Sequence, residues 1–365
     1  MSVTPATRPS RRLLLGWSTT SVPIAPLLLV GVFLGPHGLA VLSESALAAV
    51  DPALSVALAV LGILVGLECS EQRAGAPPGV APGSGLAVLT VAVVAAGLFG
   101  AATRAPALAM APWLFALLCG ICAASSLTLP GRSLPEPRRQ TDALVEAEVA
   151  AAIAAGAAVL AYVRREAPAP AALLLAQNVG IAAVLGLAGW LLTRRTTSTT
   201  ERRVFVMATL LLVGGAADFL SSSPLFAGLC AGLLWQRLGG PSREVLQRET
   251  QYVQHPFLVL VLLVAGARTD LSPLTLSLAA AYVSLRTVVR FAGGALRHRF
   301  APATSRDLRF ELVAPGVFGV AFALSVARAV ATPAGDEPSV LSVVVAGTVA
   351  ADVLARFVAA REVAP

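Results

Sequence analysis

The sequence predicts an all-α integral membrane protein with about twelve transmembrane helices. Its composition is 56% hydrophobic and 13% charged, with a mean hydropathy of +0.79, which is far more apolar than a soluble globular domain. Apolar segments recur at about the 20-residue length that a bilayer requires, and glycine, proline and arginine separate them. The 27 basic residues, all of them arginine, gather in alternate connections, which is typical of a polytopic membrane protein.

Each predicted helix is one of these apolar segments. They lie near residues 19–42, 52–69, 84–103, 107–129, 142–163, 170–193, 204–220, 223–237, 254–269, 272–295, 310–331 and 338–359. The boundary between the seventh and the eighth rests on Ser221-Ser222-Ser223-Pro224 alone. Because the polar stretches between the segments are short enough to be connections, residues 1–365 are expected to form one transmembrane domain without a soluble regulatory domain.

The arginines predict on which side of the membrane each connection lies. The outer segments hold Arg104, Arg164, Arg165 and Arg268, and the predicted helices hold Arg286, Arg290, Arg328 and Arg356. The other nineteen lie in segments on the opposite side. An excess of basic residues marks the cytoplasmic side, so we expect both termini in the cytoplasm and residues 1–18 as a cytoplasmic N-terminal segment.

Several function classes do not fit this composition. The net charge of +7 belongs to membrane connections, so no nucleic acid is expected as a partner. His37, His255 and His298 lack metal-ligand spacing, and no phosphate- or dinucleotide-binding glycine motif opens a helix. We therefore expect no cofactor and no enzyme activity. Cys119 and Cys122 have the spacing of a redox pair, but within an apolar helix a packing role is favoured.

Glu148 stands out because it precedes fifteen residues without a charge, Val149 to Val163. A charged group inside a membrane helix costs about 2.5–3.5 kcal/mol on insertion scales, so it marks an ion path or a buried pair. A carboxylate can hold a proton or a cation. The alternative is that Glu148 belongs to a polar cytoplasmic helix end with Arg138, Arg139 and Asp142. Glu146 lies about 200° away around the helix and cannot form an acid–base pair with Glu148 on one face.

Two interruptions of the apolar pattern are candidate parts of the same site. Ser125, Ser126 and Thr128 interrupt the fourth helix, and Pro315 and Gly316 interrupt the eleventh. A helix broken near the membrane midplane exposes backbone carbonyls, which is tolerated only where they line a cavity, and these oxygens can coordinate a monovalent cation.

Arg286 and Arg290 lie one turn apart in the tenth predicted helix. A guanidinium stays charged at any physiological pH, so either residue could be a fixed counter-charge for Glu148. The alternative is a set of arginines that extend toward the inner membrane surface, continuing to Arg297 and Arg299.

Further segments carry a resemblance to a known family. They are Gly31-Val-Phe-Leu-Gly35-Pro36-His-Gly38, Leu61-Gly-Ile-Leu-Val-Gly66-Leu-Glu68, Ser223-Pro-Leu-Phe-Ala-Gly228-Leu-Cys-Ala-Gly232, Phe257 to Gly266 with Asp270, Arg286-Thr-Val-Val-Arg290, and Ala314-Pro315-Gly316-Val-Phe-Gly319. In this order they resemble the monovalent cation:proton antiporters, in the bacterial branch of sodium/proton exchangers and potassium-efflux antiporters. The resemblance covers most of the chain.

The resemblance gives Glu148 a specific position. The family carries an essential aspartate in its fifth helix, ten residues after a basic residue, and here Arg138 precedes Glu148 by ten. Glu148 thus resembles the exchange-site residue, with glutamate in place of aspartate. Two departures are that Ala147 replaces a polar residue of the family and that Val317 stands where an acidic residue often follows the glycine.

The resemblance also implies an architecture and a setting. Two inverted five-helix repeats, 19–163 and 223–365, would be joined by linker helices in 164–222, with the two broken helices crossing near the midplane. A homodimer in the bacterial cytoplasmic (inner) membrane is expected.

Together these observations give the hypothesis of a secondary-active transporter that exchanges Na⁺ or K⁺ for protons by alternating access and serves pH homeostasis. One alternative is a degenerate relative without coupled transport, acting as a sensor or partner subunit. Another is a membrane-embedded enzyme acting on lipid, although the scattered acidic residues do not form the cluster that it would need.

Overall fold

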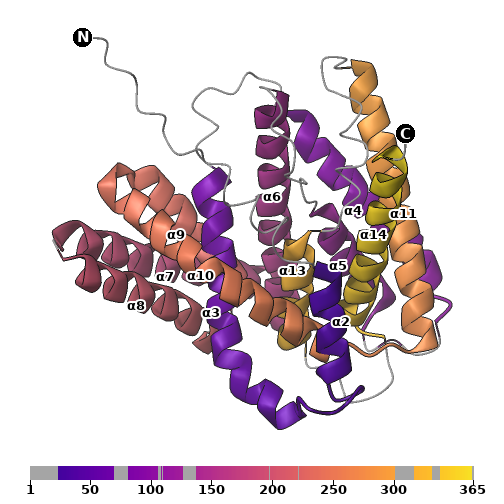
Figure 1. Ribbon diagram of the computed structural model, residues 1–365, viewed down its shortest axis with the longest axis horizontal. Coiled ribbons are helices and arrows are strands. Elements are labelled where there is room, and N and C mark those ends of the chain that lie inside the picture. The colour runs from indigo at the N-terminus through magenta and orange to yellow at the C-terminus, as the bar shows by residue number, and fades with distance from the viewer. Residues whose placement is uncertain are drawn as a thin grey trace.

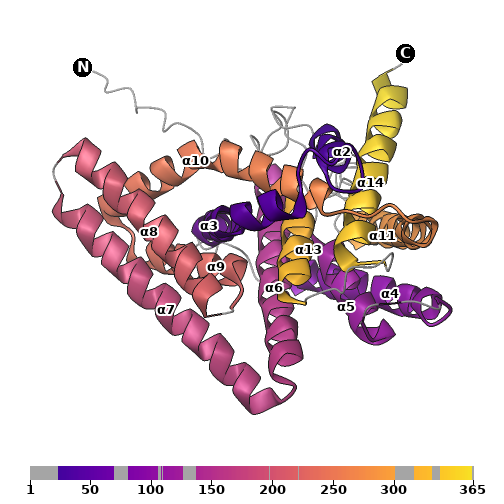
Figure 2. The ribbon, with the colours of Figure 1, turned by 90° about the horizontal axis from the view of Figure 1, so that it is seen from below.

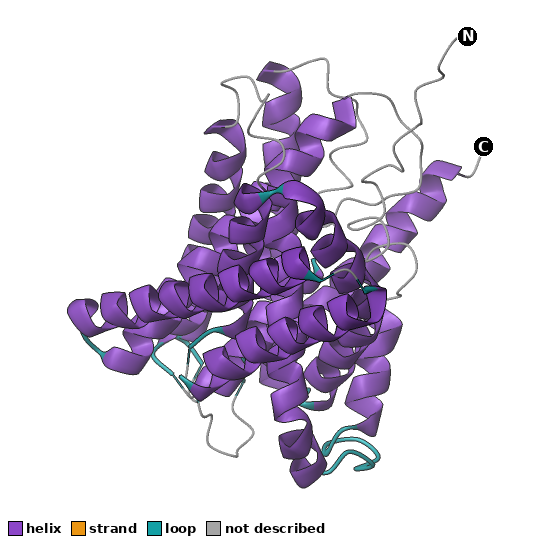
Figure 3. Ribbon diagram, turned by 90° about the vertical axis from the view of Figure 1, so that its left-hand side faces the viewer, coloured by secondary structure: helices purple, strands orange, loops and turns teal. Residues whose placement is uncertain are grey.

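The computed structural model describes residues 24–69, 81–105, 108, 110–125, 137–196, 198–220, 222–300, 316–330 and 338–363. Of these it describes the backbone alone at 68–69, 81–85, 137–147, 199, 241–242, 251, 294–300 and 355–363. Within these ranges every regular element is a helix (Figure 3). The all-α fold class is therefore as predicted.

The described helices correspond one for one, and in order, to the predicted apolar segments. They are α2 (Ile24–Leu34), α3 (Glu44–Cys69), α4 (Ala81–Ala102), α5 (Pro112–Ala124), α6 (Pro137–Arg165), α7 (Pro168–Arg195), α8 (Thr199–Phe219), α9 (Pro224–Leu238), α10 (Gly240–Ala267), α11 (Pro273–Phe300), α13 (Val317–Ala329) and α14 (Val340–Val363). The boundary before α9 is a capped helix start, because the Ser223 hydroxyl accepts a hydrogen bond from the backbone N–H of Phe226 and Pro224 opens the first turn.

Not every helix is long enough to cross a bilayer alone. By length and composition, three described helical stretches are, namely Glu44–Leu67, Pro168–Arg195 and Pro273–Gly293. The bent pair of Arg243–Thr250 and Tyr252–Ala267 would be a fourth. In contrast, α5 and α13 have 13 residues each, where a spanning helix needs about 20.

The helices form two groups that share two central members. α3, α7, α8 and α9 pack together on one side, and α4, α5, α11 and α14 pack together on the other. α6 and α13 lie between these groups and contact both (Figure 2). The site residues on α6 are therefore placed where the two groups meet.

Several contacts occur in matching pairs. α3 packs against α9 as α2 packs against α10, α4 packs against α6 as α11 packs against α14, and α5 packs against α6 as α13 packs against α14. These are the contacts expected if the five helices α2–α6 and the five helices from α9 to α14 are two related repeats. The inverted-repeat relation itself stays a prediction.

Glycines allow α3 and α9 to approach with their backbones in contact. A Cβ atom on Gly228 would meet the carbonyl oxygen of Ala59, and one on Gly232 would meet that of Ile63. Small residues at such a contact are typical of packed membrane helices. Because residue numbers rise together along both helices, α3 and α9 run in the same direction, as the predicted alternation of helices across the membrane requires.

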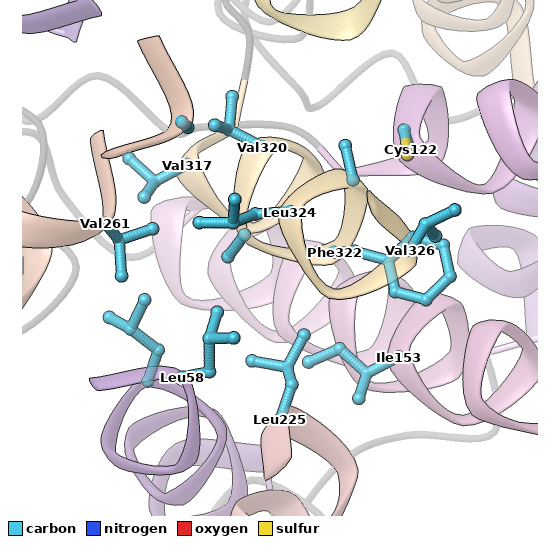
Figure 4. Packing of buried hydrophobic residues seen from close by; sticks show 14 of the residues in the cluster. Leu58, Cys122, Ile153, Leu225, Val261, Val317, Val320, Phe322, Leu324 and Val326 are labelled. Atoms are coloured by element: carbon cyan, nitrogen blue, oxygen red, sulfur yellow. The ribbon is translucent and has the colours of Figure 1, made fainter. Parts of the chain in front are cut away.

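The buried core surrounds α13 on several sides. The side chains of α13 pack among Leu58 of α3, Leu225 of α9, Val261 of α10 and Ile153 of α6 (Figure 4). All four of these residues are buried. This apolar packing holds α13, and with it the start of the helix at Val317, in a fixed position between the two groups.

Candidate ion-binding site

Glu148 lies on the central helix α6 and is buried inside the protein, with 3% of its side chain exposed. Its Oε2 accepts a hydrogen bond from Nη1 of Arg290 on α11 at 2.8 Å, and the Arg290 side chain is 0% exposed. A buried charge of this kind requires a partner of opposite charge and further hydrogen bonds. The carboxylate therefore occupies a protein-lined interior, which the transport hypothesis requires.

Both arginines of α11 bind the end of α5. Arg290 Nη2 donates to the carbonyl oxygen of Ala124, while Arg286 donates from Nε to Ala123 at 3.2 Å and from Nη2 to Ser125 at 3.0 Å. The last carbonyls of a helix lack partners within that helix, and this end of the helix attracts positive charge. The two guanidinium groups thus stabilise a helix that ends inside the molecule.

The chain leaves its helical course at Ser125 because its backbone is extended, with φ −75° and ψ 128°. The Ser125 hydroxyl donates to the carbonyl of Cys122 at 3.0 Å, so this side chain satisfies an oxygen of its own helix. The carbonyl of Ser125, rather than its hydroxyl, faces the arginine. α5 therefore presents backbone oxygens to the space near Glu148.

The start of α13 lies directly against the end of α5. Gly316 is extended, with φ −89° and ψ 141°, and helix α13 follows it. A Cβ atom on Gly319 would lie 2.7 Å from both the Cys122 carbonyl oxygen and the Ser125 hydroxyl, and one on Gly316 would lie 3.0 Å from that hydroxyl. A side chain at position 319 would clash with the backbone of α5, and one at position 316 would be tighter than an ordinary contact, so the two helix ends meet closely. α5, α6 and α13 occupy the centre of the molecule (Figure 1).

The structure therefore brings together Glu148, Arg290, Arg286, Ser125 and Gly316. Ser126, Thr128 and Pro315 lie outside the described residues, as do the side chains of Glu146 and Ala147. Arg286 and Arg290 do not extend toward a membrane surface, because they are 2% and 0% exposed.

The arrangement gathers oxygen atoms around the two arginines. One carboxylate and three backbone carbonyls supply oxygen ligands, and two guanidinium groups occupy those oxygens. Among the described residues, no group of three His, Cys, Asp or Glu side chains is placed to hold a metal ion. Cys119 and Cys122 are free and buried in α5.

A second group of charges was not predicted as a unit. Arg268 donates to Asp51 at 2.6 Å, Arg328 donates to Asp218 at 2.8 Å, and Arg328 Nε lies 3.6 Å from Asp51. These residues come from α3, α8, α13 and the end of α10, all at the ends that the arginine distribution places outside. Their shared position at predicted outer helix ends was the feature of the sequence that could have indicated this group.

Comparisons with known proteins agree with this architecture. No protein-family description matches the sequence, and no curated protein matches it either. Among solved structures, the chain resembles the sodium proton antiporter MjNhaP1 from Methanocaldococcus jannaschii, with a TM-score of 0.60 and 17% sequence identity, over 93% of this chain and 91% of that one. At this identity the likeness shows a shared fold.

Proposed function

We propose that this protein exchanges a monovalent cation for protons across a membrane, with Glu148 as the group that binds either ion. The observation that carries the proposal is the buried Glu148–Arg290 ion pair beside the two helix ends. The fold shared with a sodium proton antiporter supports it. We further propose alternating access, a homodimer, and a bacterial cytoplasmic membrane with both termini inside.

The geometry suggests how the two ions compete. In the structure Arg290 neutralises Glu148, and the guanidinium groups bind the carbonyls of Ala123, Ala124 and Ser125. A cation that reaches the carboxylate takes the place of Arg290 and can use the released carbonyl oxygens as ligands. A proton on Glu148 removes its charge, so a proton and a cation exclude each other.

Transport is tested in everted membrane vesicles that hold a preset pH gradient. Addition of sodium, potassium or lithium to vesicles containing the protein should dissipate the gradient, and the cation that does so at the lowest concentration is the substrate. Vesicles without the protein are the control. A gradient that no cation dissipates at any pH would rule out antiport.

The role of Glu148 is tested by Glu148→Gln, which keeps a hydrogen-bonding side chain but cannot carry the charge. We expect loss of exchange with normal membrane insertion. Glu166→Gln is the matched control, because Glu166 is exposed just after the same helix. Glu148→Asp should retain exchange, since it keeps the carboxylate. Undiminished transport by Glu148→Gln would remove Glu148 from the mechanism.

A second candidate function is a sensor or partner subunit without coupled transport. It is favoured by the two guanidinium groups that occupy the α5 carbonyls and by Ala147, which offers no polar side chain beside Glu148. Binding of radioactive sodium to the purified protein separates the two functions. Binding that protons displace supports exchange, and its absence together with inactive vesicles supports the second candidate.

A further inference from the structure

A cavity of about 200 Å³ lies beside the C-terminal part of α6, beyond Glu148 along the helix. It is bounded by α6, α7, α8, α9 and α13, so it lies where the group of α3, α7, α8 and α9 meets the central helices α6 and α13. Part of its wall is apolar, formed by residues such as Leu160 and Leu174. Its polar lining comes from the start of α9 and from Arg164, Asn178, Asp218, Ser325 and Arg328.

Positive charge dominates this lining. Arg164 and Arg328 contribute two guanidinium groups, and Ser222, Ser223 and Pro224 bring the N-terminus of the 15-residue helix α9 to the wall. A helix N-terminus carries about half a positive charge. Among the described lining residues, Asp218 is the one carboxylate, and its Oδ1 already accepts a hydrogen bond from Arg328 at 2.8 Å.

Arg164 is the positive charge that this ion pairing leaves over. Arg328 pairs with Asp218, and Arg268 pairs with Asp51. Together with Arg164, these side chains carry three positive and two negative charges. Arg164 lies just beyond the predicted membrane segment 142–163 and is partly buried. Burial and, next, the positive charge of Arg328 lower the pKa of the Arg164 guanidinium, although Asp218 opposes this. A bound anion would relieve both effects.

The size and the chemistry of the cavity favour an oxyanion. A water molecule takes about 30 Å³ in the liquid, so the cavity holds a group of several heavy atoms. A guanidinium group matches the oxygens of phosphate or sulfate with two parallel hydrogen bonds.

We propose that this cavity binds a small tetrahedral oxyanion, free in solution or carried by a lipid headgroup, with Arg164 and Arg328 as its charged ligands. The site is separate from Glu148 and requires no transport, so it stands or falls independently of the proposed exchange activity. It would place an anion between α7, α8 and α9 on one side and the central helices α6 and α13 on the other, at their predicted outer end.

The test is equilibrium binding of radioactive inorganic phosphate to the full chain, purified in detergent and washed free of lipid. The test variant is Arg164→Gln, and its matched control is Arg165→Gln, which removes the neighbouring charge. Arg165 is exposed and does not line the cavity. Sodium chloride at equal ionic strength is the background. Melting temperatures of the same proteins give a second readout and show that the variants fold.

We expect saturable phosphate binding in the wild type and in Arg165→Gln, and at least about tenfold weaker binding in Arg164→Gln, the loss of one charge-assisted hydrogen bond. The wild-type melting temperature should rise by about 3–5 °C at a hundredfold excess over the dissociation constant. Displacement of phosphate by phosphatidylglycerol would identify a headgroup as the occupant, and failure to displace it a soluble anion. Equal binding by the two variants, or no saturable binding in the wild type, would overturn the proposal.

Discussion

Two groups of arginine–carboxylate pairs lie at different depths in this molecule. The pair between Arg290 and Glu148 is closed to solvent, with side chains 0% and 3% exposed. The outer network joins Arg328 to Asp218, whose side chains are 14% and 42% exposed, and to Asp51, which is 33% exposed. The same two kinds of charged group thus form a pair without solvent contact at Glu148 and pairs with solvent contact in the outer network.

The difference in depth decides what each pair does. Burial removes the hydration of both ions, so a buried pair adds little net stability although losing one partner is costly. An exposed pair keeps much of its hydration and contributes at most about 1 kcal/mol. The outer network therefore forms or breaks with little change in free energy, whereas the buried pair requires the desolvation of two charges. We take this unfavourable desolvation as a sign of function at Glu148.

The largest expected effect is that of Arg290→Ala on stability. It leaves Glu148 buried without this ion pair and the Ala124 carbonyl without this donor, so the free energy of unfolding should fall by about 3–5 kcal/mol. Unfolding by titration with sodium dodecyl sulfate measures the change. The control is Arg203→Ala, because Arg203 pairs with Glu249 but is 62% exposed, and it should cost less than about 1 kcal/mol. Equal losses in the two variants would show that burial of an ion pair makes no difference to the loss of its arginine.

A smaller effect is expected when both partners are replaced by apolar residues of similar size. Glu148→Leu with Arg290→Met removes both charges, and such replacements are often neutral or stabilising by about 1–4 kcal/mol. The unpaired Ala124 carbonyl opposes this by about 1–3 kcal/mol. The double variant should therefore unfold within about 2 kcal/mol of the wild type, yet transport nothing in the vesicle assay.

The single variants Glu148→Leu and Arg290→Met, measured beside this double variant, complete a cycle that gives the coupling energy between Glu148 and Arg290. A double variant as unstable as Arg290→Ala alone would show that the pair serves the fold itself. That result would weaken the argument that its burial reflects ion exchange.

The helices and the position of Glu148 were predictable because they depend on local sequence. Hydropathy and length locate apolar helices, and a charge beside an uncharged run such as Val149 to Val163 is conspicuous. The serine-rich and Pro-Gly interruptions likewise indicated where α5 ends and where α13 begins.

The partners of the arginines were not predictable in detail. Arg286 binds the backbone carbonyls of Ala123 and Ser125, and every residue has a carbonyl, so no residue type signals this contact. Asp51 was placed just before a predicted helix, whereas α3 begins at Glu44 and carries Asp51 to Arg268, 217 positions away in the chain. Pairings across such distances follow from the packing of whole helices.

The smallest expected effect is that of Arg328→Gln in the outer network. It removes the hydrogen bond to Asp218 and the weaker contact to Asp51, so the free energy of unfolding should fall by less than about 1 kcal/mol. Because charges in contact with water are screened over about 8 Å at physiological salt and about 3 Å at 1 M, this loss should shrink in 1 M sodium chloride. The loss from Arg290→Ala should persist there, since salt does not reach a closed site. If the Arg328→Gln loss instead matches that of Arg290→Ala and resists salt, the outer network is as closed to water as the inner pair, and burial no longer distinguishes the site at Glu148.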